Sequence, residues 1–223
     1  MLDIDTSLIT DMNYLFSNEW NIWYQMRESN INLSEIEVLD LSTWDTSNVK
    51  RMHKMFYNCR GLKKLNLSSF DTFNVYDMTQ MFANCESLEK LDLSSFKTNN
   101  LKKIECMFWG CFSLTDLDIS SFDTSNIEDM NSMFRMCHNL ISLDLSNFNT
   151  SNVINMNQMF RDCNSLETLD ISNFDISNVK HMAYMFCDCM SLYDVKWPKV
   201  WNKKKLINAT YMYANCDKLK YIR

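Results

Sequence analysis

Seven methionines recur along this chain at intervals of 26 residues, with a last interval of 27. A cysteine follows each methionine four positions later. The two columns are Met55, Met81, Met107, Met133, Met159, Met185 and Met212, and Cys59, Cys85, Cys111, Cys137, Cys163, Cys189 and Cys216. A strict period of this length indicates a stack of near-identical units, each completing its hydrophobic core against the next. The chain is therefore predicted to form a solenoid. Proteins of this architecture mostly bind other molecules or form part of larger structures.

Each repeat contains two hydrophobic periodicities. Leu91 and Leu93 show the two-residue spacing of a strand, with Asp92 pointing outward between them. From Val75 to Cys85 the apolar positions step by three, three, one and three residues, which keeps them on one face of a helix. We therefore expect an α/β repeat fold, a leucine-rich-repeat-like solenoid of about seven 26-residue coils. Each coil is expected to hold a short strand, a turn and a short helix, with a parallel sheet on one face.

The turns must be built largely without glycine and proline, because the chain has two glycines and one proline. Asn, Asp and Ser tolerate turn conformations and are expected to take this part. An asparagine is placed to cap each predicted helix at Asn48, Asn74, Asn126, Asn152 and Asn178. Residues suited to a left-handed helix stop precede the column cysteines at Asn58, Asn84, Gly110, Asp162, Asp188 and Asn215, with Met136 as the exception.

The repeated aromatic, methionine and cysteine columns are interpreted as core. Aromatic residues recur at Trp44, Phe70, Phe96, Phe122, Phe148 and Phe174, and are expected to fill the space between the strand and helix layers. A thioether metal site needs ligands that converge, whereas the methionine column spreads them along an axis. We expect the column cysteines to be reduced and packed, with disulfides as the alternative. Cys106 and Cys187 lie outside the column, and Cys106 is the better candidate for an exposed, oxidisable thiol.

Composition excludes several classes of protein. The apolar share of 46% is that of a folded chain, and the net charge of −6 comes from charges of both signs scattered along it, so no nucleic-acid partner is expected. No stretch approaches the ~20 apolar residues of a membrane span. The chain opens without a basic start or an apolar run, so no signal peptide is expected. As it stands we expect an intracellular or virion-associated protein, or a cell-surface one if it is a fragment of an exported protein.

The repeat unit MFxNCxSLxxLDLSxFDTSNVxxM resembles the 26-residue leucine-rich-like repeat of BspA-like bacterial surface proteins. Its clearest copies are 117–130 and 143–156, and the resemblance covers residues 39–195 closely. Such repeats occur in surface proteins and lipoproteins of low-GC bacteria, mycoplasmas and related host-associated organisms, and in some large DNA viruses. The resemblance implies adhesion or protein interaction and brings no catalytic residues with it.

The repeat predicts three segments: an atypical N-terminal repeat or cap at 1–38, regular repeats at 39–195, and a degenerate C-terminal repeat at 196–223. The first segment contains an aromatic insert, which either closes the core or forms an exposed contact patch. The last segment holds the main basic cluster, which is either a solvated loop or a contact for an acidic partner. We identify no polar capping repeat after this segment. We therefore expect the solenoid either to self-associate end to end or to dock onto another protein.

The outward strand column consists of five aspartates and one asparagine: Asp40, Asn66, Asp92, Asp118, Asp144 and Asp170. Neighbouring strands lie ~4.8 Å apart, so directly opposed carboxylates would destabilise the sheet unless something offsets them. The serine two residues after each of them could supply hydrogen bonds, and Ca²⁺ is the alternative, since it prefers oxygen ligands. We expect hydrogen-bonded structural carboxylates and no metal.

No catalytic arrangement is predicted. The three histidines fall in different columns, and two glycines are too few for a glycine-rich phosphate loop. Carboxylates on an open sheet lack a cleft, so we expect neither an enzyme nor a cofactor.

The predicted function is recognition of a protein or surface glycan through the exposed strand face. There Lys64, Lys90, Asp116, Ser142, Thr168 and Asp194 differ from unit to unit while the core repeats. The candidate partner-binding residues are Trp20, Trp23, Tyr24, Lys64, Lys90, Asp116, Asp144, Asp170, Trp197, Trp201, Lys203, Lys204 and Lys205. The main alternative is a structural building block of a coat, virion or filament that assembles through its ends, and a host-directed effector is a third interpretation.

Overall fold

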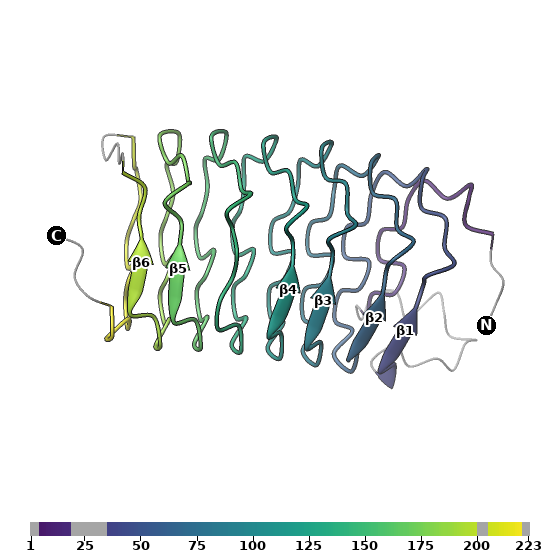
Figure 1. Ribbon diagram of the computed structural model, residues 1–223, viewed down its shortest axis with the longest axis horizontal. Coiled ribbons are helices and arrows are strands. Elements are labelled where there is room, and N and C mark those ends of the chain that lie inside the picture. Colours follow the sequence, from purple (N-terminus) through teal and green to yellow (C-terminus); the bar gives the residue numbers. More distant parts are fainter. Residues whose placement is uncertain (1–4, 19–34, 200–204, 220–223) are drawn as a thin grey trace.

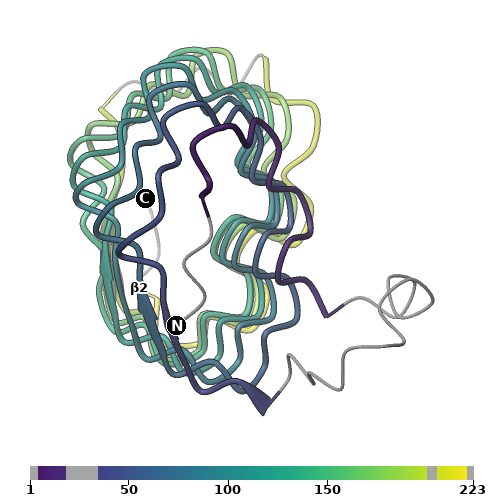
Figure 2. The same ribbon diagram turned by 90° about the vertical axis from the view of Figure 1, so that its right-hand side faces the viewer.

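The computed structural model of the protein describes residues 5–18, 35–199 and 205–219. The chain winds into coils that stack side by side, from the purple N-terminal coil at one end to the yellow-green C-terminal coils at the other (Figure 1). Seen along the stack, successive coils follow nearly the same path (Figure 2). The repeat fold predicted from the 26-residue period is therefore confirmed, while the number of coils and the three segment boundaries stay predictions.

In the described residues, six three-residue strands lie along one side of the stack (Figure 1). They are β1 (Val38–Asp40), β2 (Lys64–Asn66), β3 (Lys90–Asp92), β4 (Asp116–Asp118), β5 (Thr168–Asp170) and β6 (Asp194–Lys196). They pair in parallel as β1–β2, β3–β4 and β5–β6, with each residue opposite its repeat equivalent. In β3 the central Leu91 is buried and both flanking residues are exposed, as the two-residue periodicity predicts.

The predicted helix is wrong, because the residues that the structure describes contain no α-helix. Alternate amides in the predicted helical segment bond the next coil: Met78 and Gln80 donate to the carbonyls of Lys103 and Glu105 at 2.9 and 3.0 Å. The amides between them close tight turns, as Met81 does on Met78 at 3.1 Å. Successive four-residue β-turns, each starting two residues after the one before, satisfy the same apolar spacing as a helix. The stacked neighbour supplies the hydrogen bonds that an isolated helix would make internally.

Every second peptide group in this turn segment points the same way along the stack. The carbonyl of Asp77 accepts from Met52 in the preceding coil, and the amide of the same peptide group, that of Met78, donates to Lys103 in the following coil. The pattern recurs in the following coils, except at Ile104, whose amide makes no such backbone bond to a described residue. An ordinary strand alternates these directions, so its peptide dipoles largely cancel. Here the dipoles add along the solenoid axis, as they do in a helix.

Left-handed residues make these turns possible. The residue before each column cysteine has a positive φ, from 59° at Asn84 to 75° at Gly110, and Met136 follows the pattern at 62°. The predicted left-handed conformation is thus confirmed, but it serves a turn whose third residue needs positive φ and does not end a helix. A second left-handed position four residues earlier was not predicted; it is occupied by Lys54, Gln80, Cys106, Ser132, Gln158, Tyr184 and Tyr211.

The predicted helix-capping asparagines connect coils instead of capping helices. Asn74 donates from Nδ2 to the carbonyl of Ser47 at 2.8 Å, and Asn126 donates to that of Asn99 at 2.9 Å. Asn48, Asn152 and Asn178 bond the preceding coil in the same way. The cap prediction is therefore wrong for the same reason as the helix: the hydrogen-bond partners lie one repeat away.

A buried threonine column, which the sequence analysis missed, also joins the coils. Thr124 is fully buried; its Oγ1 donates to the carbonyl of Asn149 at 2.9 Å and accepts from the amide of Asn149 at 2.9 Å. Thr72 and Thr98 make the same pair of bonds to the next coil. Each of these hydroxyls therefore satisfies one donor and one acceptor of the neighbouring backbone at once.

Aromatic side chains stack along the axis in two ladders. The five phenylalanines of the predicted column are buried, and Trp44 at its start is half-buried. The ring centroids of Phe70 and Phe96 are 6.4 Å apart and those of Phe96 and Phe122 6.5 Å apart. A second ladder, not predicted, has centroid separations of 5.4 to 5.7 Å along Phe16, Phe56, Phe82, Phe108, Phe134, Phe160 and Phe186. The rings fill the space between the strand side and the turn side.

The cysteine column consists of free, buried thiols, as predicted. Each Sγ donates to the carbonyl of a phenylalanine in the preceding coil, for example Cys111 to Phe82 at 3.2 Å. Burial raises the pKa of Cys59, Cys111 and Cys163 to about 12. Outside the column, Cys106 is half-buried, whereas Cys187 is buried.

Candidate interaction surface

The outward residues of the strands form a continuous surface, which we call the strand face. The first strand position presents Lys64, Lys90, Asp116, Thr168 and Asp194, all exposed, and the third presents Asp40, Asn66, Asp92, Asp118, Asp170 and Lys196, also exposed. Ser142 and Asp144 take the equivalent places in the coil between β4 and β5 and are exposed as well. Five predicted site residues therefore share this face: Lys64, Lys90, Asp116, Asp144 and Asp170.

Ion pairs cross the strand face between neighbouring coils. Lys90 Nζ lies 3.5 Å from Asp116 Oδ2, and Lys196 Nζ lies 3.0 Å from Asp170 Oδ2. Their side chains are 52 to 75% exposed. Exposed pairs of this kind contribute about 0–1 kcal/mol each, so a partner could rearrange them at little cost.

The aspartate column of the strand face is hydrogen-bonded to the serines that follow it, as predicted. Asp92 accepts from the amide of Ser94 at 2.9 Å. Asp170 accepts from Ser172 Oγ at 2.7 Å and from its amide at 3.0 Å, and these bonds, aided by Lys196, lower the pKa of Asp170 to about 2. Among the described residues no cluster of three His, Cys, Asp or Glu side chains is arranged to hold a metal ion.

The same turn, in which a side-chain oxygen of Asp or Asn accepts from the amide two residues later, recurs at two other corners of several coils. Asp123 accepts from the amide of Ser125 at 3.0 Å, and Asp129 from that of Asn131 at 2.7 Å. The prediction that Asn, Asp and Ser build the turns is confirmed. The carboxylates therefore stabilise the turns of each coil through hydrogen bonds. The exposed residues that differ between coils are the lysines, the first strand position and its flanking residues.

Exposed apolar side chains border the strand face at positions that the sequence analysis did not single out. Ile141 is 54% exposed and Tyr193 43%, each one residue before the first strand position of its coil, and Val38 in β1 is 63% exposed. The equivalent residues of other coils are polar, such as Lys63 and Glu89. That departure from the repeat is the signal by which the sequence could have identified them.

A polar groove lies on another side of the solenoid. Its volume is about 580 Å³, and it is lined by Lys102, Lys103, Glu105, Asn126, Glu128, Asp129 and Asn152. Burial raises the pKa of Glu105, whose Oε2 accepts from Thr79 Oγ1 at 3.0 Å. The groove residues come from three successive coils, so the repeat assembles them although they are distant in sequence.

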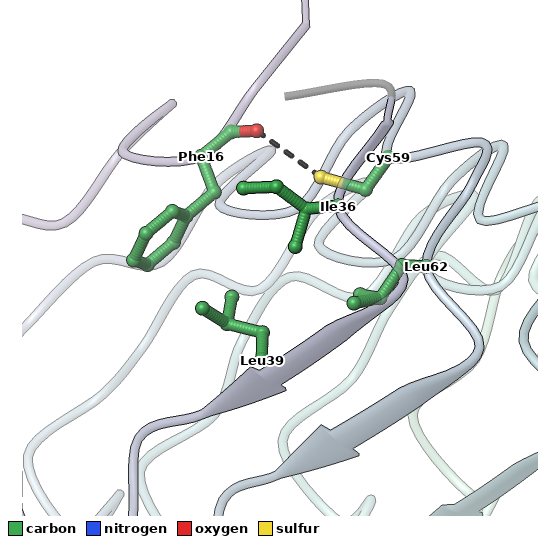
Figure 3. A pocket seen from close by; sticks show the side chains of 5 residues that line it. All are labelled: Phe16, Ile36, Leu39, Cys59 and Leu62. Carbon is green, nitrogen blue, oxygen red and sulfur yellow. Dashed lines mark hydrogen bonds between the residues drawn. The ribbon is translucent and has the colours of Figure 1, made fainter. Parts of the chain in front are cut away.

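Near the N-terminal end, a small apolar pocket is lined by Phe16, Ile36, Leu39, Cys59 and Leu62 (Figure 3). The Cys59 thiol donates to the carbonyl of Phe16 across it at 3.1 Å. A volume of about 10 Å³ has room for about one water molecule, so this pocket is a gap in the packing and not a ligand site.

The remaining predicted contact residues lie at the two ends of the chain. Trp197 is half-buried, with its ring centroid 5.8 Å from those of Phe186 and of Tyr213. Lys205 is exposed and donates to Asn178 Oδ1 at 3.1 Å. The other residues predicted for these patches, Trp20, Trp23, Tyr24, Trp201, Lys203 and Lys204, lie outside the described residues. In the ranges that are described, no helix is long and apolar enough to cross a membrane.

Comparison with known proteins places the repeat in a family. The model described as "Mycoplasma protein of unknown function, DUF285" matches the chain twice, over residues 24–120 and 111–222. No curated protein matches it. Among solved structures, a leucine-rich repeat protein from Bacteroides ovatus aligns with a TM-score of 0.35 and 18% identity, over 78% of this chain and 52% of that one. The chain thus spans about half the length of that protein. The narrower BspA-like assignment stays a prediction.

Proposed function

We propose that this chain, which belongs to the family described as Mycoplasma protein of unknown function, DUF285, is a non-enzymatic recognition protein that binds a macromolecular partner through the strand face. The partner is a protein or a surface glycan. The adhesion that the BspA-like resemblance implies would be one form of this recognition.

The observation that carries the proposal is the contrast between an invariant interior and a changing surface. The inward columns repeat phenylalanine, methionine and cysteine from coil to coil, and nearly all of these side chains are buried. The first strand position changes from Lys90 in β3 to Asp116 in β4 and Thr168 in β5, although the backbone register stays the same. A rigid scaffold with variable exposed positions matches the extended binding surfaces of other solenoids.

The strand face also combines the two kinds of contact that protein interfaces use. Its charged side chains steer association, and Ile141 and Tyr193 offer apolar area at its border. Loosely held ion pairs such as Lys90–Asp116 can exchange partners on binding. Together these features favour contact with a large surface over enclosure of a small molecule.

A photo-crosslinking experiment tests the proposal. p-Benzoylphenylalanine is placed at Tyr193, on the border of the strand face, or at Tyr76, which is 37% exposed and lies two residues before Met78, away from the strands. Illumination in an extract of the organism that encodes the chain, and on arrayed glycans, is expected to give defined adducts from the Tyr193 position that are absent at Tyr76. Adducts that are equal at both positions would exclude the strand face as the binding surface.

A charge-reversal pair refines the test. Lys64→Glu combined with Lys90→Glu changes the strand face, and Lys50→Glu combined with Lys180→Glu makes the same change in net charge at two exposed lysines elsewhere. The strand-face variant is expected to lose the adducts and the control to keep them. Loss in both variants would indicate a general charge effect instead.

A second candidate function is the structural building block, and the C-terminal end favours it. Tyr213 stacks on Phe186 with a centroid separation of 6.1 Å, and in the described part of the chain no further coil covers the other face of its ring. Within the described residues this ring face is therefore available for contact with a further coil.

A further inference from the structure

The C-terminal end of the stack presents a row of backbone donors. In the preceding coil, Met182, Tyr184, Phe186 and Asp188 donate their amides to the last described coil at 2.8 to 3.0 Å. The equivalent amides of the last coil belong to Ala209, Tyr211, Tyr213 and Asn215, and they have no acceptor among the described residues. Four parallel N–H groups therefore face away from the stack.

The N-terminal end presents the matching row of acceptors. The carbonyls of Arg51, His53, Met55 and Tyr57 accept from the first coil at 2.8 to 2.9 Å. The equivalent carbonyls of the first coil belong to Asp11, Asn13, Leu15 and Ser17, and within the described ranges no backbone amide donates to them. One end of the solenoid thus carries only donors in this segment, and the other end only acceptors.

The peptide dipoles make these two edges electrostatically complementary. Every aligned peptide group of the turn segment points its N–H toward the C-terminal end, so within this segment that edge carries the positive partial charge and the N-terminal edge the negative one. Two copies placed head to tail would continue the alignment, whereas two copies placed tail to tail would oppose donors to donors.

Apolar side chains continue across such a junction. Leu15 is 36% exposed, although the methionines that hold its place in the following coils, such as Met55, are fully buried. Phe16 stacks on Phe56 with one face at 5.5 Å, and Tyr213 ends the same ring ladder at the far end. Tyr211, which is 62% exposed, corresponds by the repeat to Tyr14 of the first coil.

We infer that the ends bind a second copy of this chain head to tail, with the amides of 209–215 donating to the carbonyls of 11–17 of the next copy. Tyr213 then stacks on Phe16, and Leu15 becomes covered as Met55 is. Because the two surfaces differ, the contact is heterologous and produces an open filament of solenoids. The inference deepens the building-block candidate and is independent of any partner of the strand face.

The first test is the mass of the full chain, measured by light scattering with reductant present over about a hundredfold range of concentration. The wild type is expected to grow with concentration. Leu15→Glu introduces a charge at the acceptor end, and Phe73→Glu introduces the same charge at an exposed position away from both ends and from the strand face. Leu15→Glu is expected to weaken association at least tenfold and Phe73→Glu to leave it unchanged. A wild type that stays monomeric throughout would overturn the inference.

A mixing experiment tests the polarity of the contact. Tyr211→Glu alters the donor end at an exposed side chain and leaves the acceptor end intact, so it complements Leu15→Glu. At a concentration just high enough for the wild type to associate, each variant alone is expected to be monomeric, and an equimolar mixture to form a dimer that grows no further. Self-association of either variant alone as strong as that of the wild type would indicate a symmetric contact and exclude the head-to-tail one. Circular dichroism checks that both variants fold, and the Tyr193 crosslink shows whether strand-face binding persists when end association is lost.

Discussion

Replacing Thr124 by Val isolates the contribution of the threonine column to cohesion between coils. The side chain is fully buried, and valine keeps its shape while removing the hydroxyl. Two hydrogen bonds of 2.9 Å disappear, one given to the carbonyl of Asn149 and one received from its amide. Both lost bonds join one coil to the next, so the change tests stacking and not the local conformation of a coil.

The expected destabilisation follows from these contacts. Two neutral hydrogen bonds contribute about 1 kcal/mol each, and an amide and a carbonyl left without partners at a part-buried site increase the loss. Burial of a methyl group in place of the hydroxyl returns up to about 0.8 kcal/mol. We therefore expect Thr124→Val to lower the free energy of unfolding by about 1–3 kcal/mol.

Urea unfolding measures the loss, with Thr115→Val as the matched control. Thr115 is exposed, and its hydroxyl makes one bond, to the carbonyl of Glu89 at 3.1 Å, so its removal should cost less than about 0.5 kcal/mol. Amide hydrogen exchange adds a local readout, because the amide of Asn149 should exchange faster in Thr124→Val. Equal stabilities of the two variants, with unchanged exchange at Asn149, would refute the assignment.

Four further expectations follow from the packing and the charges. Phe122→Ala should lower the free energy of unfolding by ~3–5 kcal/mol in urea, since the ring is 2% exposed, and a loss below about 1 would contradict its place in the core. Thiol titration should find the cysteine column protected in the native protein and reactive after unfolding, whereas disulfide-linked peptides from the column would show that it is not reduced. EDTA should leave the melting temperature unchanged, because serine amides already satisfy carboxylates such as that of Asp92; a decrease would indicate bound calcium. Asp170 should titrate near pH 2 by NMR, because Ser172 donates hydrogen bonds to its ionised carboxylate. Its contribution to stability is complete above the unfolded pKa of about 3.9 and is lost as the pH falls through 2. A native pKa near 3.9 would contradict the bonds from Ser172.

The candidate surface could be predicted where it follows the repeat and not where it departs from it. Lys64, Lys90 and Asp116 were placed on one face because the strand period is local and each repeat copies it. Ile141 and Tyr193 were missed because their exposure is evident only as a departure from the repeat. The two edges of the stack could not be predicted either, since they depend on which way each peptide group points.

The 26-residue period, the alternation of Leu91 with its neighbours and the turn-forming acids determined by themselves that this chain would stack into a solenoid with a parallel strand side and a buried cysteine column. Tertiary structure alone decided what lies opposite the strands. The spacing from Val75 to Cys85 fits a helix and a series of β-turns equally well, because both bring the same apolar side chains to one face. The turns prevail because every second amide finds its acceptor in the neighbouring coil, as Met78 does on Lys103. That acceptor exists only once the coils have stacked.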